Sequence, residues 1–141
     1  MQTLFPAKIH KNRDGLFQVR FFDIDEATTQ GKTLEEALIN AEKILNASLD
    51  ERINDEIEVN WPMMAEGKDI YSIAPAARIQ SAMMIHYSRG EKNMDEIAQK
   101  TGVSVEDFAA LEKTATSPTL DIMEKAAKAL GKRVVLIFEE I

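Results

Sequence analysis

Few side chains in this sequence are suited to catalysis, and they are widely separated. Asp23 and Asp25 lie together in one acidic stretch, while His10 and His86 are single and distant from each other. Metal-dependent hydrolysis needs several such groups converging on one ion, so these residues do not predict a metal site. The chain also has no cysteine, no phosphate-binding glycine-rich loop and no nucleophile motif. We therefore expect a protein that is not an enzyme and needs no metal or cofactor.

Nucleic-acid recognition is the chemistry that residues 93–111, NMDEIAQKTGVSVEDFAAL, indicate instead. Asn93 and Ser104 can each cap a short amphipathic helix, and Gly102 lies where the first helix must end. The apolar and small positions resemble the core of the phage-repressor type of helix-turn-helix; they are Ile97, Ala98, Gly102, Val103, Phe108 and Leu111. An ordinary helical hairpin with a glycine turn is the alternative.

In a helix-turn-helix the second helix normally enters the DNA groove. The residues that we expect to face DNA are Lys92, Met94, Lys100, Ser104, Val105, Glu106, Ala109 and Lys113. Their chemistry is unusual, because DNA-reading helices usually present Gln, Arg, Asn, Ser or Thr to the bases. Glu106 and Asp107 repel phosphates, and Met94 stands where such repressors often have a glutamine. The fold is therefore better indicated than DNA reading.

Length and charge limit the classes of partner. The 141 residues suffice for one domain or two small ones, and the net charge of −7 argues against a general coat for nucleic acid. Residues 1–60 contain 12 acidic and 7 basic side chains, which suits a basic protein partner. No apolar run is long enough to cross a membrane, and no signal-peptide pattern is present, so we expect a cytoplasmic protein.

The N-terminal half predicts a small antiparallel sheet covered by one helix. Residues 4–10 and 16–22 are rich in strand-forming residues and flank an Asp14-Gly15 turn, and a short strand is expected at 28–30. Pro6 makes the first strand an edge strand or lies near its start. Thr33 and Glu36 form a capping box that opens a long helix, and residues 70–73 predict a last strand.

The C-terminal half predicts helices and one terminal strand. A helix from Pro75 to about Ser88 leads into the 93–111 hairpin, so we place the domain boundary near Ala74. Ser117 and Pro118 begin a last helix, whose expected inner face is Leu120, Met123, Ala127 and Leu130, and Gly131 ends it.

The final run, residues 133–138, is a continuous apolar strand too hydrophobic to remain exposed. We expect it to pair with the same strand of a second chain, through Val134, Val135, Leu136, Ile137 and Phe138. Packing against its own helices, or a return to the N-terminal sheet, are the alternatives.

Several motifs, in this order of elements, resemble HicB, the antitoxin of HicA–HicB toxin–antitoxin pairs, in its helix-turn-helix variant. They are FPA (5–7), FQVRF (17–21), DIDEA (23–27), TLEEA (33–37) and AAKALGK (126–132). The resemblance implies an α+β fold. Residues 1–74 would form a partial ribonuclease-H-like βββαβ domain that binds toxin. Residues 75–141 would form an all-α helix-turn-helix domain, ending in a β-strand, for DNA binding and dimerisation.

For function, the resemblance implies an antitoxin that neutralises a small basic HicA-like toxin, which degrades mRNA, and that represses its own operon at operator DNA as a dimer or tetramer. Phe22, Asp23, Asp25 and Glu26 would face the toxin, although simple loop solubility is an equal explanation for the aspartates. Asp25 departs from the family, which commonly has proline there. The alternatives are a transcription regulator with a ligand-sensing N-terminal domain and an antitoxin with weakened DNA binding.

Overall fold

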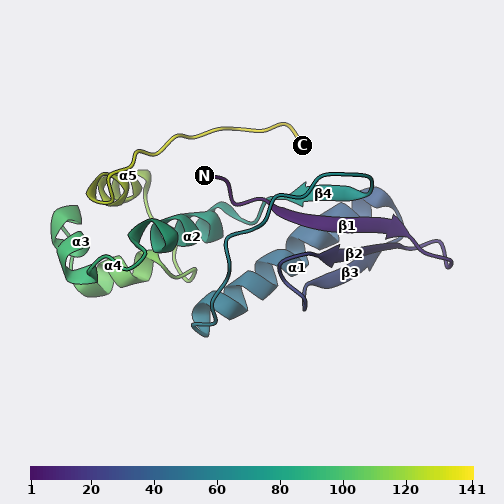
Figure 1. Ribbon diagram of the computed structural model, residues 1–141, viewed down its shortest axis with the longest axis horizontal. Coiled ribbons are helices and arrows are strands. Elements are labelled where there is room, and N and C mark those ends of the chain that lie inside the picture. Colours follow the sequence, from purple (N-terminus) through teal and green to yellow (C-terminus); the bar gives the residue numbers. More distant parts are fainter. The chain divides into compact units, whose positions relative to one another are not determined.

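Four strands and five helices follow one another along the chain, whose residues 1–141 are all described by the computed structural model (Figure 1). They are β1 (Phe5–Lys11), β2 (Phe17–Phe21), β3 (Thr28–Gly31), α1 (Leu34–Asn54), β4 (Ile70–Ile73), α2 (Ala77–Arg89), α3 (Met94–Thr101), α4 (Val105–Leu111) and α5 (Leu120–Ala129). The predicted α+β class is confirmed. Two compact units result, Met1–Gln80 and Ser81–Ile141, and the boundary between them falls within α2.

The first unit is one antiparallel sheet with strand order β3-β2-β1-β4. Val19 and Phe21 of β2 are buried, while Gln18 and Arg20 between them are exposed, as the alternation of residue types predicted. Helix α1 packs on the apolar face of this sheet (Figure 1). The sheet is therefore covered on one side and hydrated on the other.

Pro6 lies near the start of β1, which is a central strand between β2 and β4. Of the two alternatives for Pro6, the edge strand is thus wrong. Proline lacks the N–H that a ladder requires, but here only its carbonyl is used: it accepts a hydrogen bond from the Phe22 backbone N–H at 3.2 Å. That bond lies just beyond the last ladder pair, Ala7 with Phe21.

Helix α1 begins as predicted, with the Thr33 side chain accepting a hydrogen bond from the backbone N–H of Glu36 at 3.1 Å. The Glu36 carboxylate reaches back to the Lys32 backbone N–H at 3.3 Å, one residue before the position of a standard capping box. Gly31 allows β3 to approach this helix, because a Cβ there would lie 2.4 Å from the Ala37 backbone nitrogen. Ala37 itself is fully buried.

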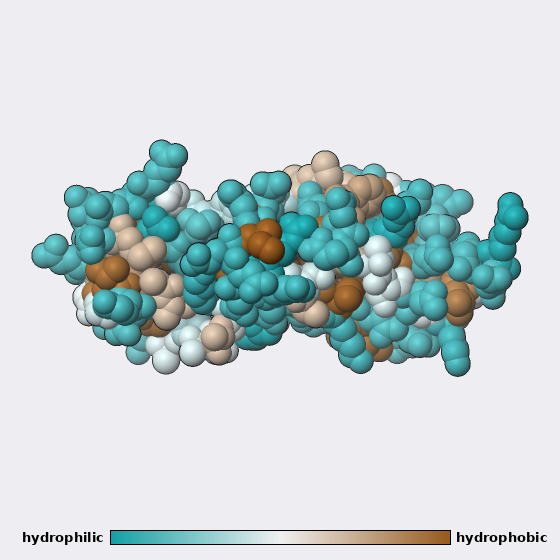
Figure 2. Space-filling model, turned by 90° about the horizontal axis from the view of Figure 1, so that it is seen from below, coloured by the Kyte–Doolittle hydropathy of each residue, from teal (hydrophilic) through white to brown (hydrophobic).

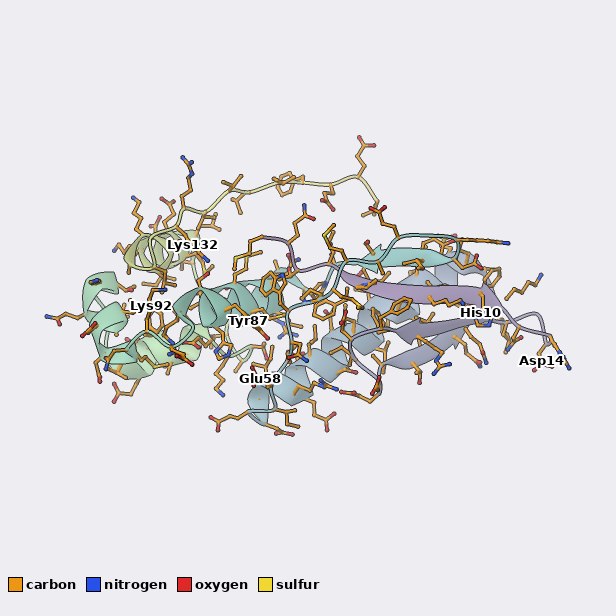
Figure 3. All side chains as sticks on the ribbon, in the orientation of Figure 1. His10, Asp14, Glu58, Tyr87, Lys92 and Lys132 are labelled. Carbon is orange, nitrogen blue, oxygen red and sulfur yellow. The ribbon has the colours of Figure 1, made fainter.

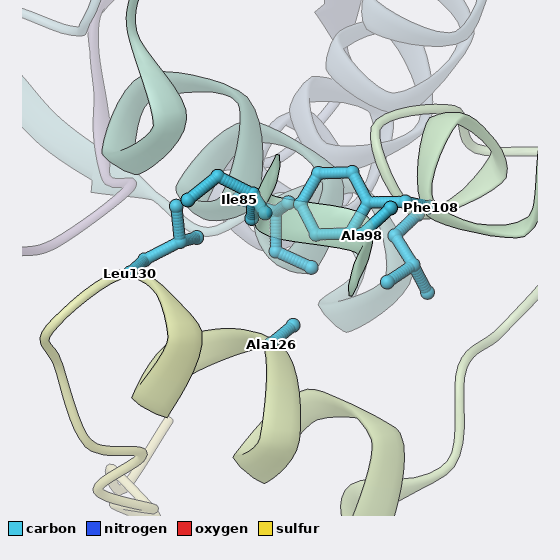
Figure 4. Close-up of a cluster of buried hydrophobic side chains, with 7 residues drawn as sticks. Ile85, Ala98, Phe108, Ala126 and Leu130 are labelled. Carbon is cyan, nitrogen blue, oxygen red and sulfur yellow. The ribbon is translucent and has the colours of Figure 1, made fainter. Parts of the chain in front are cut away.

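The second unit is a helical cluster around one small core. Its buried side chains are Ile85, Ile97, Ala98, Phe108, Leu111, Ala126 and Leu130 (Figure 4). Small Ala98 and Ala126 let the helices approach closely around Phe108, which is completely buried. Met94, Val103 and Met123 pack against this core from its edge.

Helix α5 differs from the prediction in two details, its N-cap and its buried face. Its N-cap is Thr119, whose side chain accepts from the Ile122 N–H at 3.3 Å, rather than Ser117. Leu120, predicted to lie on the inner face, is 60% exposed, and Ala126 is the fully buried residue of this helix. Ala126 and Leu130 lie four residues apart on the buried face, whereas Leu120 is the first residue of the helix and lies outside the core.

Residues 132–141 form neither helix nor strand, so the terminal strand expected at 133–138 is absent from the single chain. Val135, Leu136, Ile137 and Phe138 are exposed there. A strand is defined by hydrogen bonds to a neighbour, and no strand of this chain pairs with the segment. The expectation of a strand at 133–138 is therefore wrong for the single chain, and its pairing with a second chain stays a prediction.

Candidate functional site

The acidic loop after β2 is held by its own backbone and by two buried side chains. The Ala27 N–H donates to the Ile24 carbonyl at 3.0 Å, and the Phe21 N–H donates to the Ala27 carbonyl at 3.4 Å. Ile24 and Ala27 are almost completely buried. Asp25 and the 43%-exposed Phe22 face solvent on this fixed backbone. The loop does not need proline at position 25 to be ordered.

Glu26, predicted to face a partner, is already paired within the chain. Its two oxygens accept from Arg52 Nε at 2.5 Å and Arg52 Nη2 at 2.7 Å, in a bidentate geometry at the end of α1. The hydrogen bond from Arg52 lowers the pKa of the Glu26 carboxyl, and the bond from Glu26 raises the pKa of the Arg52 guanidinium. Part of the Glu26 charge is therefore neutralised by Arg52 within the chain.

Asp23 connects the acidic loop to a second loop, residues 55–69. Its Oδ2 accepts a hydrogen bond from the Met63 backbone N–H at 3.2 Å. Burial raises the pKa of Asp23, and the bond from Met63 opposes that rise. The structure thus brings Phe22, Asp23, Asp25 and Glu26 together on one edge of the first unit, and it adds Met63 and Met64, which the sequence did not single out.

The hairpin of α3 and α4 has the caps that the sequence predicted. The Asn93 side chain accepts from the Glu96 N–H, and the Ser104 side chain accepts from the Asp107 N–H, both at 3.1 Å. Gly102 between the helices has a left-handed φ of 84°, and its N–H bonds to the Ala98 carbonyl at 2.9 Å. Two short, capped helices therefore cross at one glycine.

The residues predicted to face DNA are distributed unevenly. Val105 and Glu106 are exposed on the first turn of α4, and Ala109 is half-buried. The Ser104 hydroxyl is used by the helix cap, and Met94 packs partly buried against the core. The face of α4 near its start is thus apolar and acidic, which does not favour phosphate contact.

The lysines of the second unit lie mostly away from the start of α4. Lys92 donates from Nζ to the Ser88 carbonyl at 3.3 Å, and Lys113 is half-buried. Lys100 lines a shallow, open depression together with Lys125 and Lys128 of α5. The sequence prediction missed these two α5 lysines, because only tertiary packing places α5 beside α3.

A charge cluster that the sequence analysis did not predict joins α2 to the end of α4, with Glu112 buried at its centre. The Glu112 carboxylate, 7% exposed, accepts from Arg89 Nε at 2.7 Å and Nη2 at 3.1 Å, and it lies 2.6 Å from His86 Nδ1. The bond to Glu112 raises the pKa of Arg89. Lys132 adds a second polar link, from its Nζ to the Ser88 hydroxyl at 2.9 Å (Figure 3). These contacts fix the hairpin on α2.

The rest of the surface carries no further chemical site. No group of three or more His, Asp or Glu side chains is placed to hold a metal ion. None of the helices has the length and apolarity required to cross a membrane. On the face seen in Figure 2, hydrophilic residues predominate and apolar residues form small, separate patches.

Comparison with known proteins identifies the family of this chain. The family described as HicB_like antitoxin of bacterial toxin-antitoxin system matches residues 4–78. Antitoxin HicB of Escherichia coli K12 is 26% identical over 134 residues, which cover 94% of this chain and 97% of that protein. Antitoxin HicB 1 of Photorhabdus laumondii is 26% identical over 135 residues, covering 96% of this chain and 86% of that protein.

Among solved structures, the crystal structure of the N-terminal domain of Burkholderia pseudomallei antitoxin HicB aligns with a TM-score of 0.40 and 21% identity, over 44% of this chain and 73% of that one. The family match covers the whole antiparallel sheet, α1 and the acidic loop. The chain therefore belongs to the family of HicB-like antitoxins of bacterial toxin–antitoxin systems.

Proposed function

We propose that the chain neutralises a small, basic, mRNA-degrading toxin by binding it through the first unit, and that the second unit represses the operon encoding the pair. The observation that carries the first half is the acidic loop at Phe22–Glu26, held rigid by Ile24 and presented at one edge of the sheet. A fixed acidic surface beside an exposed aromatic ring suits a basic protein, because the charges accelerate encounter and the ring adds buried area.

The first unit also has the element order βββαβ, which supports the partial ribonuclease-H-like fold expected for the toxin-binding domain. We assign that domain to residues 1–74 and the DNA-binding and dimerisation domain to residues 75–141.

Support for the second half comes from the hairpin geometry. A phage-repressor-like helix-turn-helix requires two capped helices, a turn between them and a shared core. The hairpin has caps at Asn93 and Ser104, a left-handed Gly102, and a core that includes Ala98 and Phe108. The exposed apolar run of Val135–Phe138 supports a two-fold dimer, since pairing it with its copy would remove a row of apolar side chains from water. A dimer also matches the symmetry of an operator with two half-sites.

An antitoxin with weakened DNA binding is the second candidate, and one observation favours it. Glu106 and Asp107 are exposed on the first turn of the proposed reading helix. Each acidic group near a phosphate opposes the counterion release that drives binding to DNA. The lysines at positions 100, 125 and 128 lie elsewhere on the second unit, where they are able to contact the backbone but not to read bases.

Two binding measurements test this proposal. The first is co-purification of the tagged chain from its native cell, in which a short, basic, stoichiometric partner is expected. A chain that retains no such partner would exclude the antitoxin mechanism proposed here. The second is fluorescence anisotropy with the promoter DNA just upstream of the gene: repression predicts tight, salt-sensitive and sequence-specific binding, whereas weak binding to any DNA would select the second candidate.

A further inference from the structure

The loop at residues 55–69 presents apolar side chains to solvent from a fixed backbone. Met64 is 92% exposed, and Met63 and Ile57 are each 53% exposed. Between them, Val59 and Pro62 are buried and anchor the loop. A loop whose anchors are buried while its largest apolar side chains face water is typical of a binding surface.

Backbone hydrogen bonds hold this loop at both of its ends. The Ile57 N–H donates to the Arg52 carbonyl at 2.8 Å, and the Asp69 carbonyl accepts from the Ile9 N–H of β1 at 2.8 Å. In the middle, the bond from the Met63 N–H to Asp23 ties the loop to the acidic loop after β2. The exposed methionines are therefore next to Phe22, which precedes Asp23 in the chain and is itself 43% exposed. We name the set Phe22, Met63 and Met64 the methionine patch.

The charge around the methionine patch indicates what binds there. Of the 24 acidic and 17 basic residues, residues 23–26 and 55–69 contain eight acidic and one basic, and the rest of the chain contains 16 of each sign. The entire net charge of −7 thus lies in the two loops that Asp23 joins. Apolar side chains on two loops rich in carboxylates complement a basic protein that has its own apolar contact residues.

Other occupants fit less well. Nucleic acid and anionic membrane surfaces would be repelled by this charge. A second copy of this chain, related by two-fold symmetry, would bring the same acidic loops together. Methionine is suited to a protein partner, because its unbranched side chain adapts to irregular surfaces.

We propose that the methionine patch is the apolar centre of the surface that binds the basic toxin, with the carboxylates of residues 55–69 as its rim. This inference rests on the proposed antitoxin function and extends it from the acidic loop to a loop far away in sequence. Truncating residues at the apolar centre of an interface typically costs most of the affinity, whereas rim charges mainly set the association rate.

Binding of the full chain to its co-purified toxin, measured by surface plasmon resonance, tests the inference. We expect the double variant Met63→Ser/Met64→Ser to bind at least about tenfold more weakly, mainly through faster dissociation. Glu58→Lys/Glu66→Lys should slow association severalfold at low salt, with the difference shrinking at high salt. Circular dichroism of each variant confirms that the chain is folded.

Matched controls lie on α1, roughly 15 to 20 Å along its axis from Arg52 at 1.5 Å per residue. Ile39→Ser removes a side chain of similar exposure, 52%, and Glu42→Lys reverses an exposed charge. Both should bind like the wild type. If the wild type binds toxin and the methionine variant binds equally well, the methionine patch is not the interface, while the antitoxin function stands. If the wild type binds no basic toxin, the proposed function fails first.

Discussion

Removing the Glu112 carboxylate should loosen the attachment of α4 to α2. In Glu112→Ala the Arg89 guanidinium, only 17% exposed, loses both of its bonds to the carboxylate. Breaking a buried ion pair by deleting one partner costs about 3–5 kcal/mol. Arg89 keeps its bonds to the Gly90 and Lys92 carbonyls, at 3.2 and 3.1 Å, so we expect the lower end of that range, about 3 kcal/mol. His86, whose side chain is 52% exposed, adds little.

Amide hydrogen exchange followed by NMR measures this loss locally. A cost of about 3 kcal/mol corresponds to roughly a hundredfold faster exchange of the protected amides of α4 and of the last turn of α2. Trp61, the single tryptophan, lies in the first unit, and its fluorescence unfolding curve should not move. Glu124→Gln, which alters an exposed carboxylate on α5, is the control and should change exchange less than threefold.

The reasoning would be refuted if Glu112→Ala exchanged no faster than the control. A second variant separates charge from packing: Arg89→Met/Glu112→Met removes both partners, leaves no unpaired buried charge, and should recover most of the lost stability. If the double variant were as unstable as Glu112→Ala, loss of packing rather than an orphaned guanidinium would explain the effect.

Three further results are expected. Gly31→Ala should prevent the first unit from folding, because its Cβ would lie 2.4 Å from the Ala37 nitrogen; a native circular dichroism spectrum and thermal midpoint would contradict the close packing of β3 on α1. Asp23→Asn keeps an acceptor for the Met63 N–H and removes a partly buried charge. Burial raises the pKa of Asp23 in the folded state above its unfolded value of 3.8, so the wild type loses stability as the pH rises from 3.8 through the folded pKa. The variant should therefore be more stable than the wild type by urea unfolding at pH 7 and should lose this advantage below pH 3.8. An equal difference in stability at both pH values would show that the Asp23 charge is not the cause. Deleting residues 133–141 should convert a dimer into a monomer in light scattering, and a truncated chain that stays dimeric would exclude pairing through the terminal segment.

Local signals in the sequence predicted most of the fold. Caps at Thr33, Asn93 and Ser104 are short-range devices, in which a side chain bonds to a backbone group three residues later, so residue types alone reveal them. The alternation in β2 and the glycine turn at Gly102 are equally local. The predicted starts of the helices and strands agree with the structure to within about two residues, whereas the strand expected at 133–138 is absent.

What the sequence could not predict depends on long-range pairing. Pro6 lies in a central strand because β4 returns to pair beside β1. That pairing is a matter of topology, which no local pattern in the sequence encodes. The terminal segment has a strand-forming composition, but no strand of this chain pairs with it, and the sequence alone does not specify that outcome.

In the candidate sites, too, local features were predicted from the sequence and long-range contacts were not. The acidic loop was predicted from residue types, but its connection to Met63 joins residues forty positions apart in sequence. The Arg89–Glu112 pair and the packing of α5 lysines near Lys100 likewise arise only when helices meet. Glu26 was predicted to face the toxin, and the structure adds that its carboxylate bonds to Arg52 while its side chain stays 46% exposed. Side-chain pairing is decided by tertiary geometry, so residue types alone overestimate how many charges are available at a surface.

Inhibition of RNA cleavage tests the central claim most directly. The toxin that co-purifies with this chain would be incubated with mRNA while the full-length chain is added in increasing amounts. The antitoxin account predicts that cleavage falls in proportion to added chain and stops near an equimolar ratio, and that Met63→Ser/Met64→Ser needs a larger excess at nanomolar concentrations. Cleavage at an undiminished rate in the presence of excess folded wild-type chain would contradict the account.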